Sequence, residues 1–334
     1  MMMAPKRQAF SFIILSLLAL SFTSINAAKG GIAVYWGQNG GEGTLSTACD
    51  TGNYEIVLLA FLNQFGCGRT PSWNFAGHCG DWSPCTKLQP DIENCQRKGV
   101  KVFLSIGGAI GPYSLCSEQD AHEVANYLYK NFLSGQYGPL GSVTLDGIDF
   151  DIEGGTNLYW DALARHLDAL RHKNKYFSLS AAPQCFMPDY YLDTAIKTGL
   201  FDYLFIQFYN NPPCQYDTSR GDATLLLQSW AHWTSYVHPN NTVYMGLPAS
   251  TAAAPSGGYI PPQDLISKVL PYIKPTPNYG GIMLWDRFND VQNNYSNQFK
   301  DLVPKSVLGF VTAVSDAVSE LVAEALKRIL PKQY

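Results

Sequence analysis

The sequence predicts a single domain folded as a closed barrel of eight parallel strands with helices between them, the (β/α)₈ or TIM-barrel class. Short apolar segments rich in β-branched and aromatic residues recur along the chain, and helical segments separate them. Several are apolar at both odd and even positions, which is typical of parallel strands covered on both faces. An open, doubly wound sheet is the alternative, but no G-x-G-x-x-G motif follows the first expected strand, which disfavours dinucleotide binding.

The expected strands are each bounded by glycine, proline or polar clusters. The 334 residues suffice for such a barrel, which typically needs about 250. The strands comprise residues 31–37, 56–62, 100–107, 147–153, 177–182, 203–209, 243–247 and 281–285. The clearest helical segments are residues 119–133, 157–172 and 263–272.

The start of the chain predicts export from the cell. Two basic residues precede an apolar stretch over residues 10–22, and small residues follow at Ala27 and Ala28. This is the layout of a secretory signal peptide over residues 1–28, and the apolar stretch is short for a membrane span. We therefore expect a secreted protein, extracellular or vacuolar.

The end of the chain differs from the barrel domain, which we expect to cover residues 29–305. Residues 306–334 carry apolar side chains at helical spacing, with a proline at position 331. Either a helix that packs on the barrel or a removable sorting peptide would explain this extension, and the sequence leaves both open.

Cysteine content agrees with export. An even number of cysteines in a secreted chain predicts disulfides, here four, although spacing alone does not give their connectivity. Zinc is disfavoured because no C-x-x-C pair is present. Asn240 and Asn294 begin N-glycosylation sequons. The cysteines are Cys49, Cys67, Cys79, Cys85, Cys95, Cys116, Cys185 and Cys214.

Charge and aromatic content narrow the class of ligand. The formal net charge is −4, which gives no indication of the basic face that a nucleic acid would require. A neutral polysaccharide is compatible with this charge. Aromatic residues make up 13% of the chain, and aromatic faces suit the stacking of sugar rings, although a large aromatic core would also explain them.

Three acidic residues alternate with apolar ones in the fourth expected strand. Asp149, Asp151 and Glu153 fall on one face of the strand, and Phe150 and Ile152 on the other. In a barrel the apolar pair would meet the helices while the acids point inward. A solvated edge or a metal site would be the alternatives, but the strand is too apolar for an edge and no further acid or histidine cluster lies nearby.

Crowded carboxyl groups favour acid catalysis. Neighbouring carboxylates cannot all ionise, so at least one pKa rises, and a carboxyl group that stays protonated near neutral pH can serve a glycosidase as proton donor. Glu153 lies nearest the carboxyl end of its strand, the end at which barrels of this class place their active sites. We therefore expect Glu153 to be the proton donor.

This strand and several other segments resemble glycoside hydrolase family 18, and within it the plant class III chitinases, from residue 30 to about residue 303. The strand matches the D-x-x-D-x-D-x-E signature of that family. The supporting segments are G-I-A-V-Y-W-G-Q-N-G at 31–40, A-G-H-C at 76–79, S-I-G-G at 105–108, A-A-P-Q-C at 181–185, Q-F-Y-N-N-P-P-C at 207–214 and G-G-I-M-L-W at 280–285.

The resemblance implies an endochitinase that cleaves β-1,4 bonds between N-acetylglucosamine units with retention, in defence against fungi; a lysozyme side activity is left open. Glu153 would protonate the scissile oxygen, and the substrate's own acetamido oxygen would attack the anomeric carbon to form an oxazolinium ion. Asp151 would orient the acetamido N–H, and Asp149 would share a proton with Asp151. No metal or cofactor is implied, and a monomer that binds chitin and chitooligosaccharides is the expected state.

The resemblance also assigns groups that bind substrate. Tyr209 would donate to the acetamido carbonyl, Gln207 would hold the sugar and Trp285 would form the floor of the site. Tyr35 is a weaker candidate, since simple packing explains it equally well. Gly108 would approach the sugar closely.

Class III relatives further suggest the bridges Cys49–Cys95, Cys79–Cys85 and Cys185–Cys214. Cys67 and Cys116 remain, and the usual pattern lacks them. They fall in the loops after the second and third strands, which are neighbours in a barrel, so we expect them to form a fourth bridge.

Two departures from the family pattern bear on activity. Relatives usually carry a third glycine where this chain has Ala109, and a methyl group there would narrow the cleft. The pair Asp286–Arg287 after Trp285 is one that we associate with xylanase inhibitors of the same fold. A non-catalytic lectin, storage protein or inhibitor is therefore the alternative. The presence of the complete catalytic set favours the enzyme.

Overall fold

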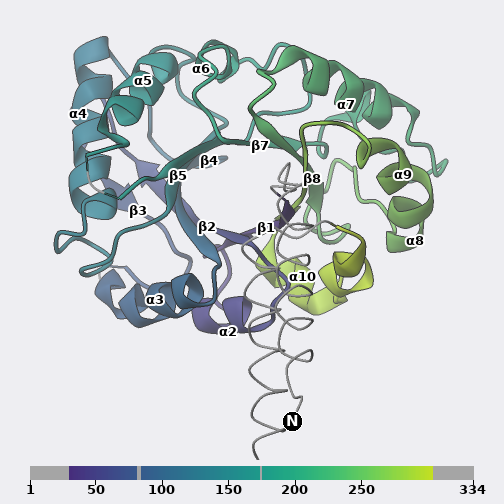
Figure 1. Cartoon of the computed structure of the whole chain (residues 1–334), viewed down its shortest axis with the longest axis horizontal. Helices are drawn as coiled ribbons and strands as arrows, with labels where there is room; N and C mark the ends of the chain where they lie inside the picture. Colours follow the sequence, from purple (N-terminus) through teal and green to yellow (C-terminus); the bar gives the residue numbers. More distant parts are fainter. Residues whose placement is uncertain (1–29, 81–83, 174, 304–334) are drawn as a thin grey trace, which may run out of the picture.

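Nine strands form one sheet in the computed structural model, which describes residues 30–80, 84–173 and 175–303. Eight of the strands run parallel and close into the predicted barrel, because β1 pairs with both β2 and β9 (Figure 1). The expected signal peptide and the extension over residues 306–334 lie outside the described residues. The barrel strands are β1 (Gly31–Trp36), β2 (Ile56–Gln64), β4 (Lys101–Gly108), β5 (Gly147–Ile152), β6 (Ser178–Ala181), β7 (Tyr203–Gln207), β8 (Thr242–Pro248) and β9 (Tyr279–Trp285).

All eight expected strands are present, and for two of them an earlier end than the sequence predicts moves a site residue out of the strand. β5 ends at Ile152, so Glu153 lies one residue beyond it, and its backbone N–H binds the Tyr113 hydroxyl instead of a neighbouring strand. β7 ends at Gln207, so Tyr209 lies in the following loop. The short strand β3 (Ser72–Trp73), which pairs antiparallel with β2, was not predicted.

Helices form the outer ring of the barrel (Figure 1). The expected helix over 119–133 is α4 followed by a π-helical turn, Tyr129–Leu133. The expected helix over 263–272 is divided by the π-helical turn Leu265–Val269, next to Pro271, which has no N–H to donate. The helices are α2 (Leu45–Asp50), α3 (Gln89–Arg97), α4 (Glu118–Leu128), α5 (Trp160–Leu170), α6 (Asp193–Ile196), α7 (Thr224–Tyr236), α8 (Pro262–Asp264), α9 (Leu270–Ile273) and α10 (Arg287–Asn293).

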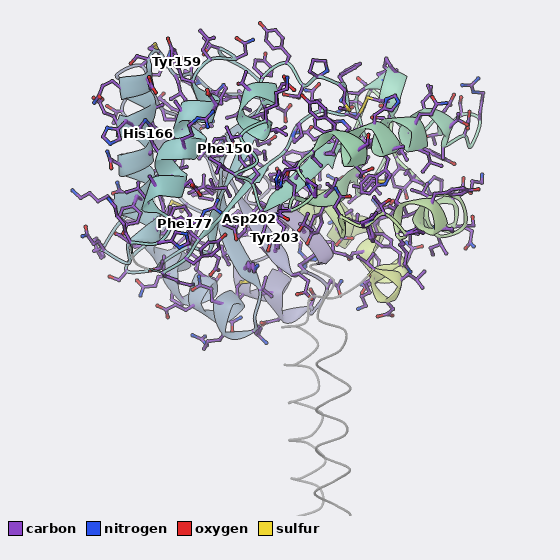
Figure 2. The ribbon with its side chains drawn as sticks, turned by 45° about the horizontal axis from the view of Figure 1, so that its top comes forward. Phe150, Tyr159, His166, Phe177, Asp202 and Tyr203 are labelled. Atoms are coloured by element: carbon purple, nitrogen blue, oxygen red, sulfur yellow. A yellow bond between two sulfur atoms is a disulfide. The ribbon has the colours of Figure 1, made fainter. Side chains whose placement is uncertain are left out.

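The alternation of side chains along the strands divides the core in two. Phe150 and Ile152 of β5 belong to a large outer cluster between the strands and the helices, together with Phe177, which Figure 2 also labels. A smaller inner cluster fills the barrel and includes Phe205 and Met283. The apolar face of β5 therefore meets the helices, as its sequence pattern predicts.

The amino ends of the strands close the inner cluster with a polar pair. Lys101 Nζ donates to the Tyr203 hydroxyl at 2.6 Å and lies 5.1 Å from the centre of the Tyr203 ring. Tyr203 also packs on Phe205 of the same strand, with ring centres 6.2 Å apart. Figure 2 shows Tyr203 beside Asp202, which accepts the backbone N–H of Leu179.

The eight cysteines form four disulfides, and the pairs are those expected: Cys49–Cys95, Cys67–Cys116, Cys79–Cys85 and Cys185–Cys214. Both sequon asparagines, Asn240 and Asn294, are exposed, and their glycosylation stays a prediction. Within the described part of the chain, no helix combines the length and apolar character needed to cross a membrane.

Candidate active site

The deepest acidic group of the site is Asp149. It is fully buried in the barrel and accepts hydrogen bonds from three hydroxyl groups: Tyr35 at 2.9 Å, Ser105 at 2.7 Å and Ser180 at 2.6 Å. Strand register explains the two serines, because β4 and β6 place Ser105 and Ser180 directly opposite Asp149. Burial raises the pKa of Asp149, and these three hydrogen bonds lower it.

Asp151 and Glu153 form a coupled pair above Asp149. The two carboxyl groups lie close enough for each to shift the pKa of the other. Burial raises the pKa of Asp151 well above its usual range, and the nearby charges of Glu153 and Asp149 raise it further. Burial also raises the pKa of Glu153, which hydrogen bonds from Gln207 and Asp151 partly offset. The pair therefore tends to retain one proton.

Gln207 bridges the two carboxyl groups from the end of β7. Its Nε2 donates to Asp151 Oδ1 at 2.9 Å and to Glu153 Oε1 at 3.2 Å, and it lies 3.1 Å from the carbonyl oxygen of Ala182. Gln207 is 5% exposed, so its amide is held in place. It fixes the relative position of the pair without adding charge.

A pocket of about 170 Å³ opens over this pair at the carboxyl ends of the strands. Asp151, Glu153, Gln207 and Tyr209 line it, and Trp285 from the end of β9 contributes an aromatic wall. The Trp285 ring stacks on Phe61, with ring centres 6.0 Å apart and planes 21° apart. Residues that also line the pocket are Phe61, Ala109, Gln184, Asn210 and Asn211.

Tyr209 is buried next to the acidic pair. Burial raises the pKa of its phenol well above the ordinary value, and the charges of Asp151 and Glu153 raise it further. The hydroxyl therefore stays protonated at neutral pH and can donate a hydrogen bond into the pocket.

Two of the expected substrate-binding residues do not line the pocket. Tyr35 is 1% exposed and lies beneath the pocket, where it donates to Asp149 and meets the edge of Trp285. Gly108 is also buried, and the next residue, Ala109, lines the pocket instead. The sharing of a proton between Asp149 and Asp151 stays a prediction, and Asp149 already accepts hydrogen bonds from Ser105 and Ser180.

The departures Ala109 and Asp286–Arg287 differ in their relation to the pocket. Ala109 is exposed in its wall, as the sequence suggests. Asp286 instead caps α10 and accepts the backbone N–H of Asn289 at 3.0 Å. Arg287 points to Tyr54 and donates to its hydroxyl at 2.8 Å. The Asp286–Arg287 pair therefore serves the junction of β9 with α10 and does not line the pocket.

Several supporting residues escaped the sequence analysis. Ser105 and Ser180 could have been found from strand register, because both lie on the inward parity of β4 and β6. Tyr113 and Asp189 lie in loops, and no local pattern indicates them. Asp189 is 4% exposed and accepts three backbone N–H groups, including that of Gln184 at 2.9 Å.

The arrangement suits proton transfer to a neutral ligand. A carboxyl pair that holds one proton, a phenol that donates and an aromatic wall meet in one pocket, and the wall suits a sugar ring. The only group of metal-ligating side chains found in the described residues is Cys67, Cys116 and Asp120, and its two sulfurs are bonded to each other. Those sulfurs are therefore not free to bind a metal as thiolates.

Comparisons with known proteins agree with this geometry. The family model of the glycosyl hydrolases family 18 matches residues 31–259. An acidic endochitinase of Cicer arietinum is 54% identical over 294 residues, which cover 87% of this chain and 98% of that protein.

Solved structures show the same fold. The ICChI chitinase from Ipomoea carnea is 49% identical, with a TM-score of 0.78 over 81% of this chain and 99% of that chain. A xylanase and α-amylase inhibitor protein from Scadoxus multiflorus, XAIP-II, is 43% identical, with a TM-score of 0.75 over 80% of this chain and 97% of that chain. The family model, the relatives and the pocket with its paired carboxyl groups agree. This chain therefore belongs to family 18 of the glycosyl hydrolases.

Proposed function

We propose that this chain is an endochitinase that hydrolyses β-1,4 bonds between N-acetylglucosamine units with retention of configuration. The observation that carries the proposal is the buried pair of carboxyl groups, Asp151 and Glu153, which Gln207 bridges inside a pocket walled by Trp285. Relatives at about half identity that are named acidic endochitinases support the substrate class.

The proposed reaction needs no nucleophile from the protein. Glu153 donates its proton to the scissile oxygen as the bond to the leaving sugar breaks. The acetamido oxygen of the bound sugar then attacks its own anomeric carbon and forms an oxazolinium ion. Glu153, now a carboxylate, takes a proton from the water that opens this ion, and the configuration is retained.

Two neighbours of Glu153 support the reacting sugar. Asp151 accepts the acetamido N–H and stabilises the positive charge of the ion, and Tyr209 donates to the acetamido oxygen. Gln207 keeps Asp151 and Glu153 at a fixed separation through its two hydrogen bonds. Asp149 remains below them, held by hydroxyl groups, and its negative charge raises the pKa of Asp151.

A non-catalytic inhibitor is the alternative, and likeness to the XAIP-II protein is the observation behind it. The same pocket, however, holds the acidic pair, Gln207 and Tyr209 together, which an inhibitor of other enzymes has no need to preserve. The enzyme is therefore the proposal that we favour.

Product analysis on chitohexaose tests the proposal. We expect shorter oligosaccharides with the β-anomer formed first, as seen by mass spectrometry and anomer-resolved NMR. The variant Glu153→Gln should lose about 10³-fold or more in kcat, as expected for the loss of a general acid, while still binding the oligosaccharide. Glu123→Gln is a matched control, because Glu123 is exposed on α4. A wild-type protein that binds chitohexaose without cleaving it would favour the non-catalytic alternative.

We also propose that the chain is exported, extracellular or vacuolar, acts as a monomer and serves in defence against fungi. Its four disulfides fit an oxidising compartment. Amino-terminal sequencing of the protein from its native tissue should place the new terminus near Ala28, and size-exclusion chromatography with light scattering should give the mass of one chain.

A further inference from the structure

Tyr113 connects the two strand ends that form the acidic side of the pocket. Its hydroxyl donates to the carbonyl oxygen of Gly108, at the end of β4, at 2.6 Å. The same hydroxyl accepts the backbone N–H of Glu153, just past the end of β5, at 2.9 Å. Since β4 and β5 are paired only up to Gly108 and Ile152, this hydroxyl extends the connection to Glu153 itself.

The ring of Tyr113 has little freedom to move. It is 3% exposed and stacks on Phe65, with ring centres 5.6 Å apart and planes 9° apart. The edge of Trp160 meets it at 6.5 Å and 68°. These contacts hold the hydroxyl in one place.

Glycines let the surrounding loops approach Tyr113 closely. Gly155 has φ of +71°, and a Cβ there would lie 2.3 Å from the Tyr113 carbonyl oxygen. Gly66 also has φ of +71°, and a Cβ there would lie 2.0 Å from the Ser114 carbonyl oxygen. The loops after β2, β4 and β5 therefore meet at Tyr113, where larger side chains would separate them.

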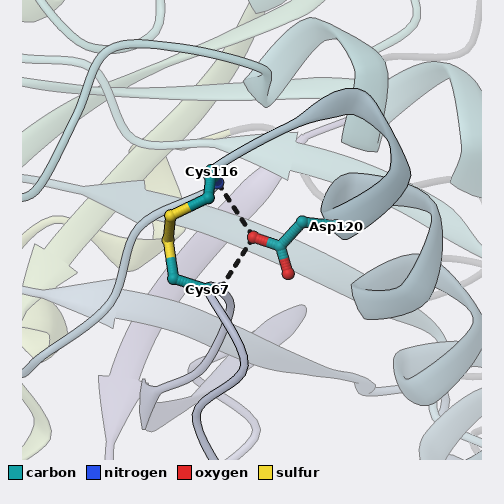
Figure 3. Close-up of side chains that lie close together, drawn as sticks. All are labelled: Cys67, Cys116 and Asp120. Atoms are coloured by element: carbon teal, nitrogen blue, oxygen red, sulfur yellow. Dashed lines mark hydrogen bonds between the residues drawn. A yellow bond between two sulfur atoms is a disulfide. The ribbon is translucent and has the colours of Figure 1, made fainter.

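A disulfide joins two of the loops that meet at Tyr113, those after β2 and β4. Cys67 follows Phe65 and Cys116 follows Tyr113 by a few residues, and the bridge between them spans the two loops. Asp120 Oδ2 accepts the backbone N–H of Cys67 at 2.7 Å and that of Cys116 at 2.9 Å (Figure 3). One carboxylate oxygen thus holds both halves of the bridge.

We propose that Tyr113 is a positioning residue for Glu153, and that the Cys67–Cys116 bridge keeps it in place. The inference rests on the proposed role of Glu153 as proton donor. Without the hydroxyl, the Glu153 N–H and the Gly108 carbonyl oxygen lose their partner, and the segment that carries the acid is free to shift. A displacement of about 1 Å in a reacting group can cost about 100-fold in rate.

The first test replaces Tyr113 by phenylalanine, which keeps the stacked ring. We expect kcat on chitohexaose to fall 10- to 100-fold, with KM changed less than about 2-fold, because the walls that bind sugar are unaltered. The matched control is Tyr295→Phe, since the buried Tyr295 hydroxyl also donates to a backbone oxygen, that of Ile260, at 2.8 Å. This control should lose thermal stability and keep kcat.

A pH profile separates displacement from a loss of folded enzyme. Fewer active molecules would lower the rate equally at every pH. A displaced Glu153 would lose part of the Gln207 hydrogen bond that lowers its pKa, so the basic limb of the Tyr113→Phe profile should move to higher pH. An unmoved profile with a kcat like that of Tyr295→Phe would overturn the proposal.

The second test removes the bridge and does not depend on folding of the first variant. Cys67→Ala/Cys116→Ala is compared with Cys49→Ala/Cys95→Ala. The two bridges span nearly equal sequence separations, 49 and 46, so their effects on the unfolded chain are similar. Cys49 and Cys95 join α2 to α3 and do not line the pocket.

The kcat of both variants is measured well below their melting temperatures. Only the variant without the Cys67–Cys116 bridge should lose kcat, by about 3-fold or more, because a small displacement of Glu153 is enough to slow proton transfer. Equal kcat in the two variants would refute the role of the bridge. Glu153→Gln distinguishes this inference from the proposed function: if that variant keeps full activity, the proposed role of Glu153 fails. If Glu153→Gln is inactive while Tyr113→Phe is fully active, the positioning role alone fails.

Discussion

The two ends of the barrel bury polar groups in opposite ways. At the amino ends of the strands, the Lys101 ammonium is stabilised by a short hydrogen bond to Tyr203 and by the face of its ring. At the carboxyl ends, Asp149, Asp151 and Glu153 crowd together, and among the described residues none of them forms an ion pair with a cation.

The polar pair at the amino ends serves stability, whereas the acidic group at the carboxyl ends serves the proposed reaction. The lower pair satisfies a cation in a way that favours the folded state. In the upper group, burial raises the pKa values of all three acids, and like charge raises those of Asp151 and Glu153 further. The folded state therefore binds protons more tightly than the unfolded chain, and its stability falls as the pH rises through these pKa values. The fold thus tolerates an unfavourable charge arrangement where proton transfer is proposed.

The largest expected effect comes from neutralising the middle of the upper group. Asp151→Asn keeps the shape of the side chain and removes the negative charge that would stabilise an oxazolinium ion. We expect kcat on chitohexaose to fall about 10²- to 10³-fold, the loss typical of removing one preorganised electrostatic contact. Asp301→Asn, at an exposed position, is the control and should leave kcat unchanged. A loss of less than 5-fold would show that the crowded charge is not needed for turnover.

The lower pair should give the reverse result. Tyr203→Phe keeps the ring under the Lys101 ammonium and removes the hydroxyl that accepts its hydrogen bond. The free energy of unfolding should fall by about 1.5–2 kcal/mol, as for other hydrogen bonds to charged groups. Urea denaturation measures this, and kcat should stay within 2-fold of wild type. A large fall in kcat would mean that the two ends of the barrel are not independent.

The upper group was predictable because its members lie on one strand and the residue that follows it. A period of two was enough to place Asp149, Asp151 and Glu153 on the inward face, since regular strands leave no other choice. The same reasoning gave the eight strands, whose apolar segments are long enough to be distinguished from loops. It also indicated the outer core, as Phe150 and Ile152 show.

Contacts between elements were harder to predict. Ser105 and Ser180 depend on the register of β4 and β6 against β5, which the sequence of one strand does not contain. Tyr113 depends on three loops that converge over a disulfide. Tyr35 was a weaker candidate for substrate contact, with simple packing as an equal explanation. An inward side chain on β1 can stop beneath a pocket as readily as it can line it, and here a hydrogen bond to Asp149 holds Tyr35 below.

A smaller expected effect is the change of protein stability with pH that the raised pKa of Glu153 causes. The pKa of Glu153 is higher in the folded state than that of a free glutamate side chain, so the folded state binds the proton more tightly than the unfolded one. The stability that this proton contributes is present at low pH and is lost as the pH rises through the folded pKa. Glu153→Gln carries no charge at any pH, so it should become more stable relative to wild type as the pH rises from about 4 to 7.

We expect a gain of about 1 kcal/mol at pH 7, or about 2 °C in Tm, and little gain at pH 4. Calorimetry of both proteins across this range measures it, with Glu123→Gln as the exposed control. A gain that is constant with pH would point to improved packing, and a loss at pH 7 would mean that the carboxylate is better satisfied than its neighbours suggest.

The smallest expected effect concerns the rim of the pocket. Ala109 is exposed in the wall, one residue beyond Gly108, so its methyl group can meet a sugar without being part of the core. Ala109→Gly should lower KM for chitohexaose by about 2-fold, less than the 10-fold or more that one methylene contributes in a closed hydrophobic pocket. Since neither the acids nor Tyr113 contact this methyl group, kcat should be unchanged. A change in kcat with constant KM would instead mean that residue 109 acts through the backbone after β4 and not through the width of the cleft. In that case the backbone after β4 would help to set the position of Glu153, as we propose for Tyr113.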